Sequence, residues 1–523
     1  MAGGYEPARD EFIELSRHFN LIPVWREVVA DLETPVSAFR KLDEGRFSYL
    51  LESVEGGENL GRYSFLGKTA FLTFRSRGNR VEVAGADGCR EFIAADPIDS
   101  LKQVVGRYNS PDVPDLPRFY GGAVGYISYD AVRFIEGLPD KNPDPLGLPE
   151  LYFIFTDVVL VFDHVKHKIK VVVNARTEED PDRAALIYDR ALESIDEVVA
   201  SLEKATSIRP LALTDATGAP GRGAGNGSLV QELPYPSHFR SNLSKGSFVE
   251  AVTRAKEYIA AGDIFQVVLS QRFSVAVEAE PFDIYRVLRT INPSPYMYYL
   301  NFGDLHIAGS SPEVMVRVED GVAELRPIAG TRPRGGDRSE DERLARELLL
   351  DEKEKAEHIM LVDLGRNDLG RACEFGSVDV DELMVVERYS HVMHMVSNVQ
   401  GRLLPGKDQF DVLRATFPAG TVSGSPKIRA MEIIDELEPA RRGPYAGAIG
   451  YFSFSGNMDT CITIRTIVLC DGEAHIQAGA GIVADSDPER EYHETVNKAK
   501  ALMKAVLETP VSRERATSSP GSP

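Results

Sequence analysis

The chain has 523 residues, of which 43% are hydrophobic and 27% are charged, so it can bury substantial cores, and its length predicts two or three domains. Its 59 basic and 80 acidic side chains leave a net charge of -21. This balance argues against a general role in binding nucleic acid or an anionic membrane surface.

The N-terminus shows no targeting signal, because no basic segment is followed there by an apolar core. No stretch approaches the roughly 20 apolar residues that span a bilayer. The four cysteines form no CxxC pair and have no metal-ligand spacing, which is typical of reduced thiols. We therefore predict a cytoplasmic protein without a membrane or nucleic-acid partner.

Strand-like and helical patterns both occur in the region 1–207. Runs of β-branched and aromatic residues at 70–75, 152–156 and 169–173 predict strands, and helical periodicity predicts a helix over 181–204. Residues 208–238 follow, with a stretch at 214–228 that is rich in Gly, Ala and Thr. This composition predicts a flexible linker or a long surface loop.

The region 239–509 also mixes the two kinds of pattern. Helices are predicted at 247–261, 339–364, 427–437 and 488–507, with β-rich stretches between them. The last helix has Asp487 as its cap and Pro488 in its first turn. The tail 510–523 is predicted to be disordered. Both regions therefore indicate an α+β fold.

The chain contains one weak internal echo, between residues 121–129 and 446–454. In both segments small residues alternate with aromatic residues, which suits strands whose backbones approach closely. Two interpretations remain open, namely paired halves of the fold or convergent strand composition.

Two glutamate doublets suggest a metal site. Glu354 and Glu357 form one doublet, Glu491 and Glu494 form the other, and on a helix the i, i+3 spacing places both carboxylates on one face. Two such helices could present four carboxylates to a hard cation such as Mg²⁺. The alternative is a solvated face, since the first doublet lies in a run of charged residues.

Two glycine-containing segments lack the spacing of nucleotide-binding motifs. Residues 479–481 miss the third glycine of the dinucleotide fingerprint, and residues 424–427 miss the P-loop pattern. Their backbone N–H groups could instead cradle carboxylates, with Arg465 as a bidentate clamp. A substrate with two carboxylates would fit such a site.

Five segments, 310–313, 327–335, 357–371, 418–427 and 479–482, together resemble the chorismate-utilising enzymes, and within them the large subunits of anthranilate synthase. The resemblance covers nearly the whole chain. It implies large antiparallel sheets packed as a sandwich with helices on the outside. It also implies a chorismate-binding domain over 239–509 and a region 1–207 that contributes to a regulatory site.

The resemblance also implies roles for single residues. Glu357 and Glu494 correspond to direct Mg²⁺ ligands, with Glu354 and Glu491 contributing directly or through water. Glu313 corresponds to the general acid that protonates the leaving 4-hydroxyl of chorismate, and His394 to the histidine of the second half-reaction. The positions that contact chorismate are Thr421, Tyr445, Arg465, Gly479, Ala480, Gly481 and Lys498.

Two positions indicate the subfamily. Relatives that add water carry a catalytic lysine where this chain has Gln266, which favours ammonia as the nucleophile. Aminodeoxychorismate synthases commonly carry a lysine where this chain has Ala329. The expected products are therefore anthranilate and pyruvate, with aminodeoxychorismate synthase as one alternative and a catalytically silent tryptophan sensor as another.

Two partners are implied. The chain has no Gly-x-Cys-x-Gly glutaminase motif, so a separate glutamine amidotransferase subunit is expected, in a heterodimer or heterotetramer. Other residues resemble the family's binding site for tryptophan as a feedback inhibitor. They are Glu52, Ser53, Asn292, Pro293, Pro295, Tyr296, Met297 and Tyr451.

Overall fold

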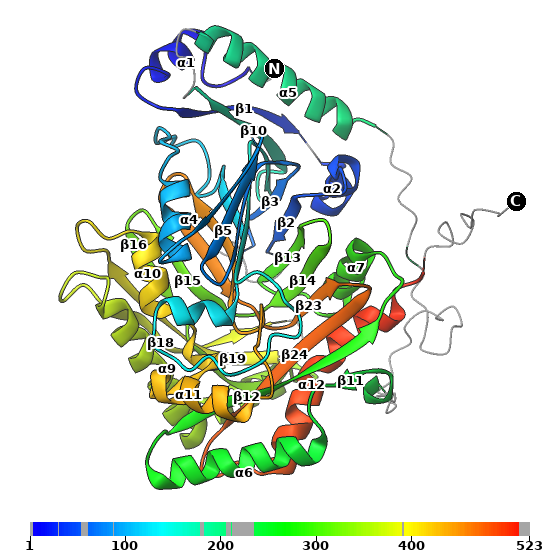
Figure 1. Ribbon diagram of the computed structural model, residues 1–523, viewed down its shortest axis with the longest axis vertical. Coiled ribbons are helices and arrows are strands. Elements are labelled where there is room, and N and C mark those ends of the chain that lie inside the picture. The colour runs from blue at the N-terminus through cyan, green and yellow to red at the C-terminus, as the bar shows by residue number, and fades with distance from the viewer. Residues whose placement is uncertain are drawn as a thin grey trace, which may run out of the picture.

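The computed structural model describes residues 4–29, 31–53, 61–86, 88–177, 183–204, 211, 235–389 and 392–511. In these residues, two antiparallel sheets of 12 strands each form the centre of the molecule and helices lie on the outside (Figure 1). The predicted α+β sandwich is confirmed. None of the helices in these ranges is long and apolar enough to cross a membrane.

The first sheet combines strands from both ends of the chain. Its order is β1 (Leu21–Val29), β10 (Lys168–Arg176), β9 (Val158–Asp163), β3 (Tyr63–Gly67), β2 (Ser48–Glu52), β13 (Tyr296–Asn301), β14 (Leu305–Ser311), β23 (Thr466–Cys470), β24 (Glu473–Ile482), β12 (Gln266–Ala276) and β11 (Arg240–Ser241), with β20 (Gly424–Ser425) paired to β12.

The second sheet also combines strands from the N-terminal and C-terminal regions of the chain. Its order is β17 (Ile328–Pro333), β19 (Val392–Arg402), β16 (Val322–Leu325), β15 (Val314–Glu319), β22 (Met458–Ile462), β21 (Ala448–Ser453), β7 (Gly122–Ile127), β8 (Leu151–Thr156), β4 (Ala70–Arg77), β5 (Arg80–Gly85) and β6 (Gly88–Ile93), with β18 (Asp379–Arg388) paired to β19.

The helices pack on the outer faces of the sheets. They are α1 (Arg9–Leu15), α2 (Pro35–Leu42), α4 (Pro97–Val105), α5 (Ala184–Leu202), α6 (Lys245–Ala261), α7 (Pro281–Ile291), α8 (Arg338–Leu350), α9 (Glu352–Gly370), α10 (Gln409–Thr416), α11 (Lys427–Leu437) and α12 (Pro488–Glu508), with short 3₁₀ turns η1 (Tyr129–Phe134), η3 (Tyr235–His238) and η4 (Gly420–Val422).

Three hydrophobic layers hold this arrangement together. One cluster, with Tyr126 of β7 and Tyr298 of β13 among its members, lies between the two sheets. A second lies between the first sheet and helices α1, α2, α5, α7 and α12, and a third includes the outer face of the second sheet with α4, α9 and α10. Because hydrophobic burial is the main driving force of folding, these layers fix the strands and helices that carry the site.

Strands from the regions 1–207 and 239–509 pair directly within both sheets, β2 with β13 and β7 with β21. The two echoing segments of the sequence are β7 and β21, and Gly125 lies opposite Gly450 in this pair. A Cβ atom on Gly125 would lie 1.9 Å from the backbone oxygen of Tyr152, and one on Gly450 would lie 2.0 Å from that of Asp459. The echo therefore marks the junction of the two regions in the second sheet.

The predicted elements agree well with the structure, with one correction. The strands at 70–75, 152–156 and 169–173 lie within β4, β8 and β10, and the last helix is α12. The single helix predicted over 339–364 is wrong, because α8 ends at Leu350 and α9 begins at Glu352. The side chain of Asp351 accepts hydrogen bonds from the backbone N–H groups of Lys353 and Glu354, so it caps a new helix. The predicted linker 208–238 and tail 510–523 lie largely outside the described residues.

Candidate active site

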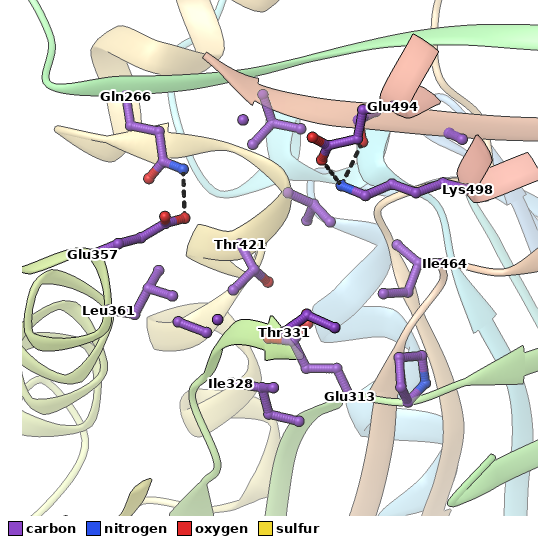
Figure 2. Close-up of a pocket in the computed structure, with 18 of the residues that line it drawn as sticks. Gln266, Glu313, Ile328, Thr331, Glu357, Leu361, Thr421, Ile464, Glu494 and Lys498 are labelled. Carbon is purple, nitrogen blue, oxygen red and sulfur yellow. Dashed lines mark hydrogen bonds and ion pairs between the residues drawn. The ribbon is translucent and has the colours of Figure 1, made fainter. Parts of the chain in front are cut away.

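Residues of α9, α12 and strands β12, β17 and β24 line a cavity of about 630 Å³, and Figure 2 draws part of this lining. The cavity gathers residues that lie more than 200 positions apart in the chain. The predicted site residues that line it are Gln266, Glu313, Glu354, Glu357, His394, Thr421, Tyr445, Arg465, Gly479, Gly481, Glu491, Glu494 and Lys498.

Both glutamate doublets lie at the N-terminal ends of their helices. Glu354 and Glu357 belong to α9, which Asp351 caps, and Glu491 and Glu494 belong to α12. The side chain of Asp487 accepts a hydrogen bond from the backbone N–H of Arg490 and so caps α12, as predicted. All four carboxylates line the same cavity, although the side chain of Glu494 remains 47% exposed.

One carboxylate of each doublet has a raised pKa. Desolvation raises the pKa of Glu357 and the charge of Glu354 raises it further, against the hydrogen bond from Gln266. Desolvation also raises the pKa of Glu491, as does the charge of Glu494, against a hydrogen bond from Ser486. A cation relieves such repulsion, and oxygen ligands suit Mg²⁺, so the donor set fits this ion.

Two of the four glutamates, Glu494 and Glu354, already contact basic side chains. Lys498 Nζ lies 2.7 Å from Glu494 Oε1 (Figure 2), and Arg332 Nη1 lies 3.3 Å from Glu354 Oε1. Within the described ranges, no three of the four glutamates bring ligand atoms within 4.8 Å of one another. Closing the carboxylates around an ion would therefore require their side chains to move.

Glu313 lies in the wall of the cavity, in surroundings that favour the protonated form of its carboxyl group. Desolvation raises its pKa to about 8, although interactions with the side chains of Thr421, Lys498 and Arg465 oppose this rise. Its backbone oxygen accepts a hydrogen bond of 3.0 Å from the N–H of Ile462. A carboxyl group with this pKa keeps its proton at neutral pH, which is the requirement for a general acid.

His394 is held as a neutral base. Its Nδ1 lies 3.0 Å from the backbone oxygen of Gly330, and because a carbonyl oxygen only accepts, Nδ1 carries the proton. The lone pair is therefore on Nε2. Burial lowers the pKa of His394, so the neutral form dominates near neutral pH. The competing residue His391 lies outside the described residues.

The opposite wall is suited to carboxylate binding. Arg465 adopts a φ of 52°, a strained conformation for a residue with a side chain, and its guanidinium makes no hydrogen bond or ion pair with the described residues. Thr421 Oγ1 is buried beside Glu313 without a hydrogen bond of standard geometry to the described residues. Lys498 Nζ donates to the backbone oxygen of Gly479 at 3.1 Å. These groups leave donors for an anionic substrate.

The strand β24 turns its glycines toward the cavity. A Cβ atom on Gly479 would lie 2.7 Å from the hydroxyl of Tyr445, and one on Gly481 would lie 2.7 Å from Gln266 Nε2. Ala480, which the resemblance also implied, does not line the cavity. Successive side chains in a strand point to opposite faces, and Ala480 is fully buried in the hydrophobic layer behind.

Several residues of the cavity were missed by the sequence analysis. They include Ile328, Thr331, Lys353, Leu361, Ile464 and Gln477. Strand alternation could have indicated Gln477, because residues 477, 479 and 481 lie on the same face of β24. Lys353 gave no signal, since it lies in a run of charged residues.

A second, small cavity of about 50 Å³ lies where β2 meets β13. Of the residues implied for tryptophan binding, those that line it are Glu52, Ser53, Pro295, Tyr296, Met297 and Tyr451. Asn292 and Pro293 do not line it, and Asn292 Nδ2 instead donates to Ser310 Oγ at 2.8 Å. The two segments, 245 positions apart in sequence, meet because Glu52 lies opposite Met297.

Polar groups in this second cavity are strongly paired. Glu52 accepts hydrogen bonds from Arg289 at 3.1 Å and from the hydroxyl of Tyr285 at 2.5 Å. Tyr296 donates to Asp459 at 2.9 Å, and Arg317 binds the same carboxylate. The hydroxyl of Tyr451 is buried without a partner among the described residues, which leaves it for a ligand.

Comparison with known proteins shows the family to which this fold belongs. The model of the chorismate binding enzyme family matches residues 50–504, so the chain belongs to the chorismate binding enzymes. It is 52% identical to anthranilate synthase component 1 of Acetivibrio thermocellus (96% of this chain, 99% of the relative) and 51% identical to that of Aquifex aeolicus (95% and 97%).

A solved structure gives the same picture. The chain resembles anthranilate synthase component I from Streptococcus pneumoniae TIGR4, with 38% identity, a TM-score of 0.73, and coverage of 91% of this chain and 98% of the other. The resemblance inferred from the sequence motifs is therefore confirmed, both for the family and for the relatives within it.

Proposed function

We propose that this protein is the large subunit of an anthranilate synthase, a lyase that converts chorismate and ammonia into anthranilate, pyruvate and water. This would be the first step of tryptophan biosynthesis. The observation that carries the proposal is the placement of Glu313 in one cavity with both glutamate doublets and a carboxylate-binding wall. The identity to anthranilate synthase component 1 proteins supports it.

The chain's own residues suggest how the reaction proceeds. Arg465, Thr421 and Lys498 would bind the enolpyruvyl carboxylate and orient the ring. Glu313 would give its proton to the departing 4-hydroxyl as ammonia attacks C2, so that water leaves. Nε2 of His394 would then take the C2 proton as pyruvate departs with the enolpyruvyl oxygen and the ring becomes aromatic. The attached ammonium group would return one proton to Glu313, and the proton taken by His394 would pass to the methylene carbon of the departing enolpyruvate, which becomes pyruvate.

A magnesium ion would fit between the doublets. Glu357 and Glu494 would hold it, with Glu354 and Glu491 contributing directly or through water. When bound, Mg²⁺ supplies charge neutralisation for the ring carboxylate of chorismate. Its contribution explains how a chain with a net charge of -21 would hold a doubly anionic substrate next to four glutamates.

Two positions support amination at C2. Gln266 lines the cavity and donates to Glu357 at 3.2 Å (Figure 2), and an amide supplies no base for the addition of water. Ala329 also lines the cavity, where it offers no amine for a covalent adduct. The alternative, aminodeoxychorismate synthase, would release an aminated product that keeps the enolpyruvyl group.

The source of ammonia would be a separate glutamine amidotransferase subunit, in a heterodimer or heterotetramer. The relatives are described as component 1, a name that implies a further component. The cytoplasm is the proposed location. Tryptophan would inhibit by binding in the second cavity, which must widen to admit an indole because its volume is only about 50 Å³.

The test is turnover by the purified chain with chorismate and Mg²⁺, given either ammonium or glutamine, with the product identified by mass. Anthranilate from ammonium but not from glutamine, lost on removal of Mg²⁺, supports the activity, the metal and the missing subunit. Suppression by tryptophan supports the inhibitory site. Tryptophan binding by folded protein without any turnover would instead favour the silent sensor.

A further inference from the structure

A row of polar positions continues from the active-site cavity along one face of the first sheet. Residues directly opposite one another in an antiparallel pair share a face. The opposite pairs of β12 and β24 in this row are Val268 with Gly481, Ser270 with Gly479, Arg272 with Gln477, and Ser274 with His475. Arg272 and Gln477 therefore lie one step beyond the glycines that line the active site.

At this step lies a separate cavity of about 20 Å³. Arg272 and Gln477 both line it, and Gln477 and Tyr445 also belong to the wall of the active-site cavity. A cavity needs about 10–15 Å³ to hold one water molecule. The space therefore fits a single molecule of that size, next to the proposed reaction.

One wall of this small cavity presents an acceptor without a donor. The N–H and hydroxyl of Ser270 both donate to Glu438 Oε1 at 2.8 Å, so the hydroxyl of Ser270 must accept from Gln477 Nε2, also at 2.8 Å. These donor and acceptor roles fix which atom of the Gln477 side-chain amide is the nitrogen and which is the oxygen. Gln477 Oε1 is left buried, with no hydrogen-bond partner among the described residues.

The facing group is a donor without an acceptor. Arg272 is only 7% exposed, and its guanidinium forms no hydrogen bond or ion pair within the described part of the chain. The nearby cation Arg442 is paired with Glu438 at 2.7 Å. Burial lowers the pKa of His475, so it stays neutral. Asp144, Glu438 and Asp130 act on Arg272 through their charges, but none of them forms an ion pair with it in the described part of the chain. The charge of Arg272 therefore dominates the cavity.

We propose that this cavity binds neutral ammonia, the nucleophile of the proposed reaction on which this inference rests. The lone pair of NH₃ accepts a hydrogen bond from Arg272, and an N–H donates to Gln477 Oε1. Ammonium has no lone pair and is repelled by the guanidinium, and a halide has no proton to donate. Gln477 thus contacts the nucleophile, and Arg272 selects its uncharged form.

The test compares the KM for ammonia, calculated as NH₃ at saturating chorismate, with the dissociation constant of chorismate measured by calorimetry without ammonium. In Gln477→Met and Arg272→Met the KM rises about tenfold, the loss expected for one hydrogen bond, and chorismate binding stays within twofold of wild type. Arg254→Met, which removes an arginine with a side chain 52% exposed on α6 and outside the cavity wall, serves as the control and leaves both values unchanged.

A second measurement uses the wild type and so needs no variant to fold. Between about pH 7.5 and 9, where the ratio of ammonium to ammonia changes steeply, the KM calculated as NH₃ stays constant, because ammonium does not compete. In Arg272→Met the KM calculated as NH₃ rises as the pH falls, because ammonium is no longer repelled and competes for the cavity.

Three outcomes overturn parts of the account separately. A KM for NH₃ that is unchanged in both variants means that the cavity holds water only, and it overturns the ammonia site. A wild-type KM for NH₃ that rises at low pH, by competition from ammonium, overturns it as well. A wild-type protein that makes no aminated product at all contradicts the proposed function instead.

Discussion

Gln266 Nε2 donates a hydrogen bond to Glu357 Oε1 at 3.2 Å and so joins strand β12 to helix α9. The contact orients the carboxylate that is proposed to hold the metal. It exists because residue 481 is glycine, since a Cβ atom there would lie 2.7 Å from the same Nε2. The contact between Gln266 and α9 thus depends on the absence of a Cβ atom at residue 481 of β24.

Gly481→Ala tests this dependence. The added methyl group displaces the amide of Gln266, and a shift of about 1 Å in a catalytic group costs about 100-fold in rate, so kcat/KM for chorismate should fall by that order. Gly370→Ala is the matched control, because nothing lies within 4 Å of a Cβ atom there. Equal steady-state kinetics for the two variants would show that Gln266 does not position Glu357.

Glu313→Gln tests the general acid. The pKa of Glu313 is raised to about 8, so the carboxyl group carries its proton below that pH and loses it above. At a fixed concentration of NH₃, the rate should fall as the pH rises through about 8, and Glu313→Gln should lower kcat by about 100- to 10,000-fold. A pH profile of wild-type kcat without this limb would argue against the role.

Glu357→Gln tests the metal site. Removal of one carboxylate charge should weaken Mg²⁺ binding at least tenfold, because even the outer partners of metal ligands contribute about 10- to 100-fold. Calorimetric titration with Mg²⁺ provides the measurement. Glu352→Gln is the control on the same helix, since its side chain is 87% exposed. If both variants bind Mg²⁺ as the wild type does, the ion lies elsewhere.

Tyr451→Phe tests the second cavity. The hydroxyl of Tyr451 is buried without a described partner, so its removal should leave the free energy of unfolding unchanged or raise it by about 1 kcal/mol. If tryptophan uses this hydroxyl, its dissociation constant should rise several-fold while chorismate binding is unaffected. Calorimetry with both ligands separates the effects. A large loss of stability would mean that the hydroxyl has a structural role.

Local signals predicted the elements that carry the site. The doublets on α9 and α12 were visible as i, i+3 spacing, and α12 begins directly after its predicted cap, Asp487. The break at Asp351 was missed, although an Asp followed three residues later by Glu354 is a helix-start signal. The charged run around it suggested a continuous exposed helix.

Long-range geometry set the limit of prediction. Ala480 was placed among the contacts because it lies within a matching motif, but strand alternation buries it behind the cavity. Asn292 was assigned to the inhibitor site with its neighbours, but it binds Ser310. Gln477 and Arg272 lie on different strands, and only the register of β12 and β24 brings them opposite each other.

The most direct test of the central claim is a time course of purified protein with chorismate, ammonium and Mg²⁺, in which anthranilate is followed by fluorescence and pyruvate is assayed in the same samples. The account predicts that both products appear in a one-to-one ratio and at the same rate. An aminated chorismate that accumulates without pyruvate would contradict it and would assign the cavity to the sister reaction.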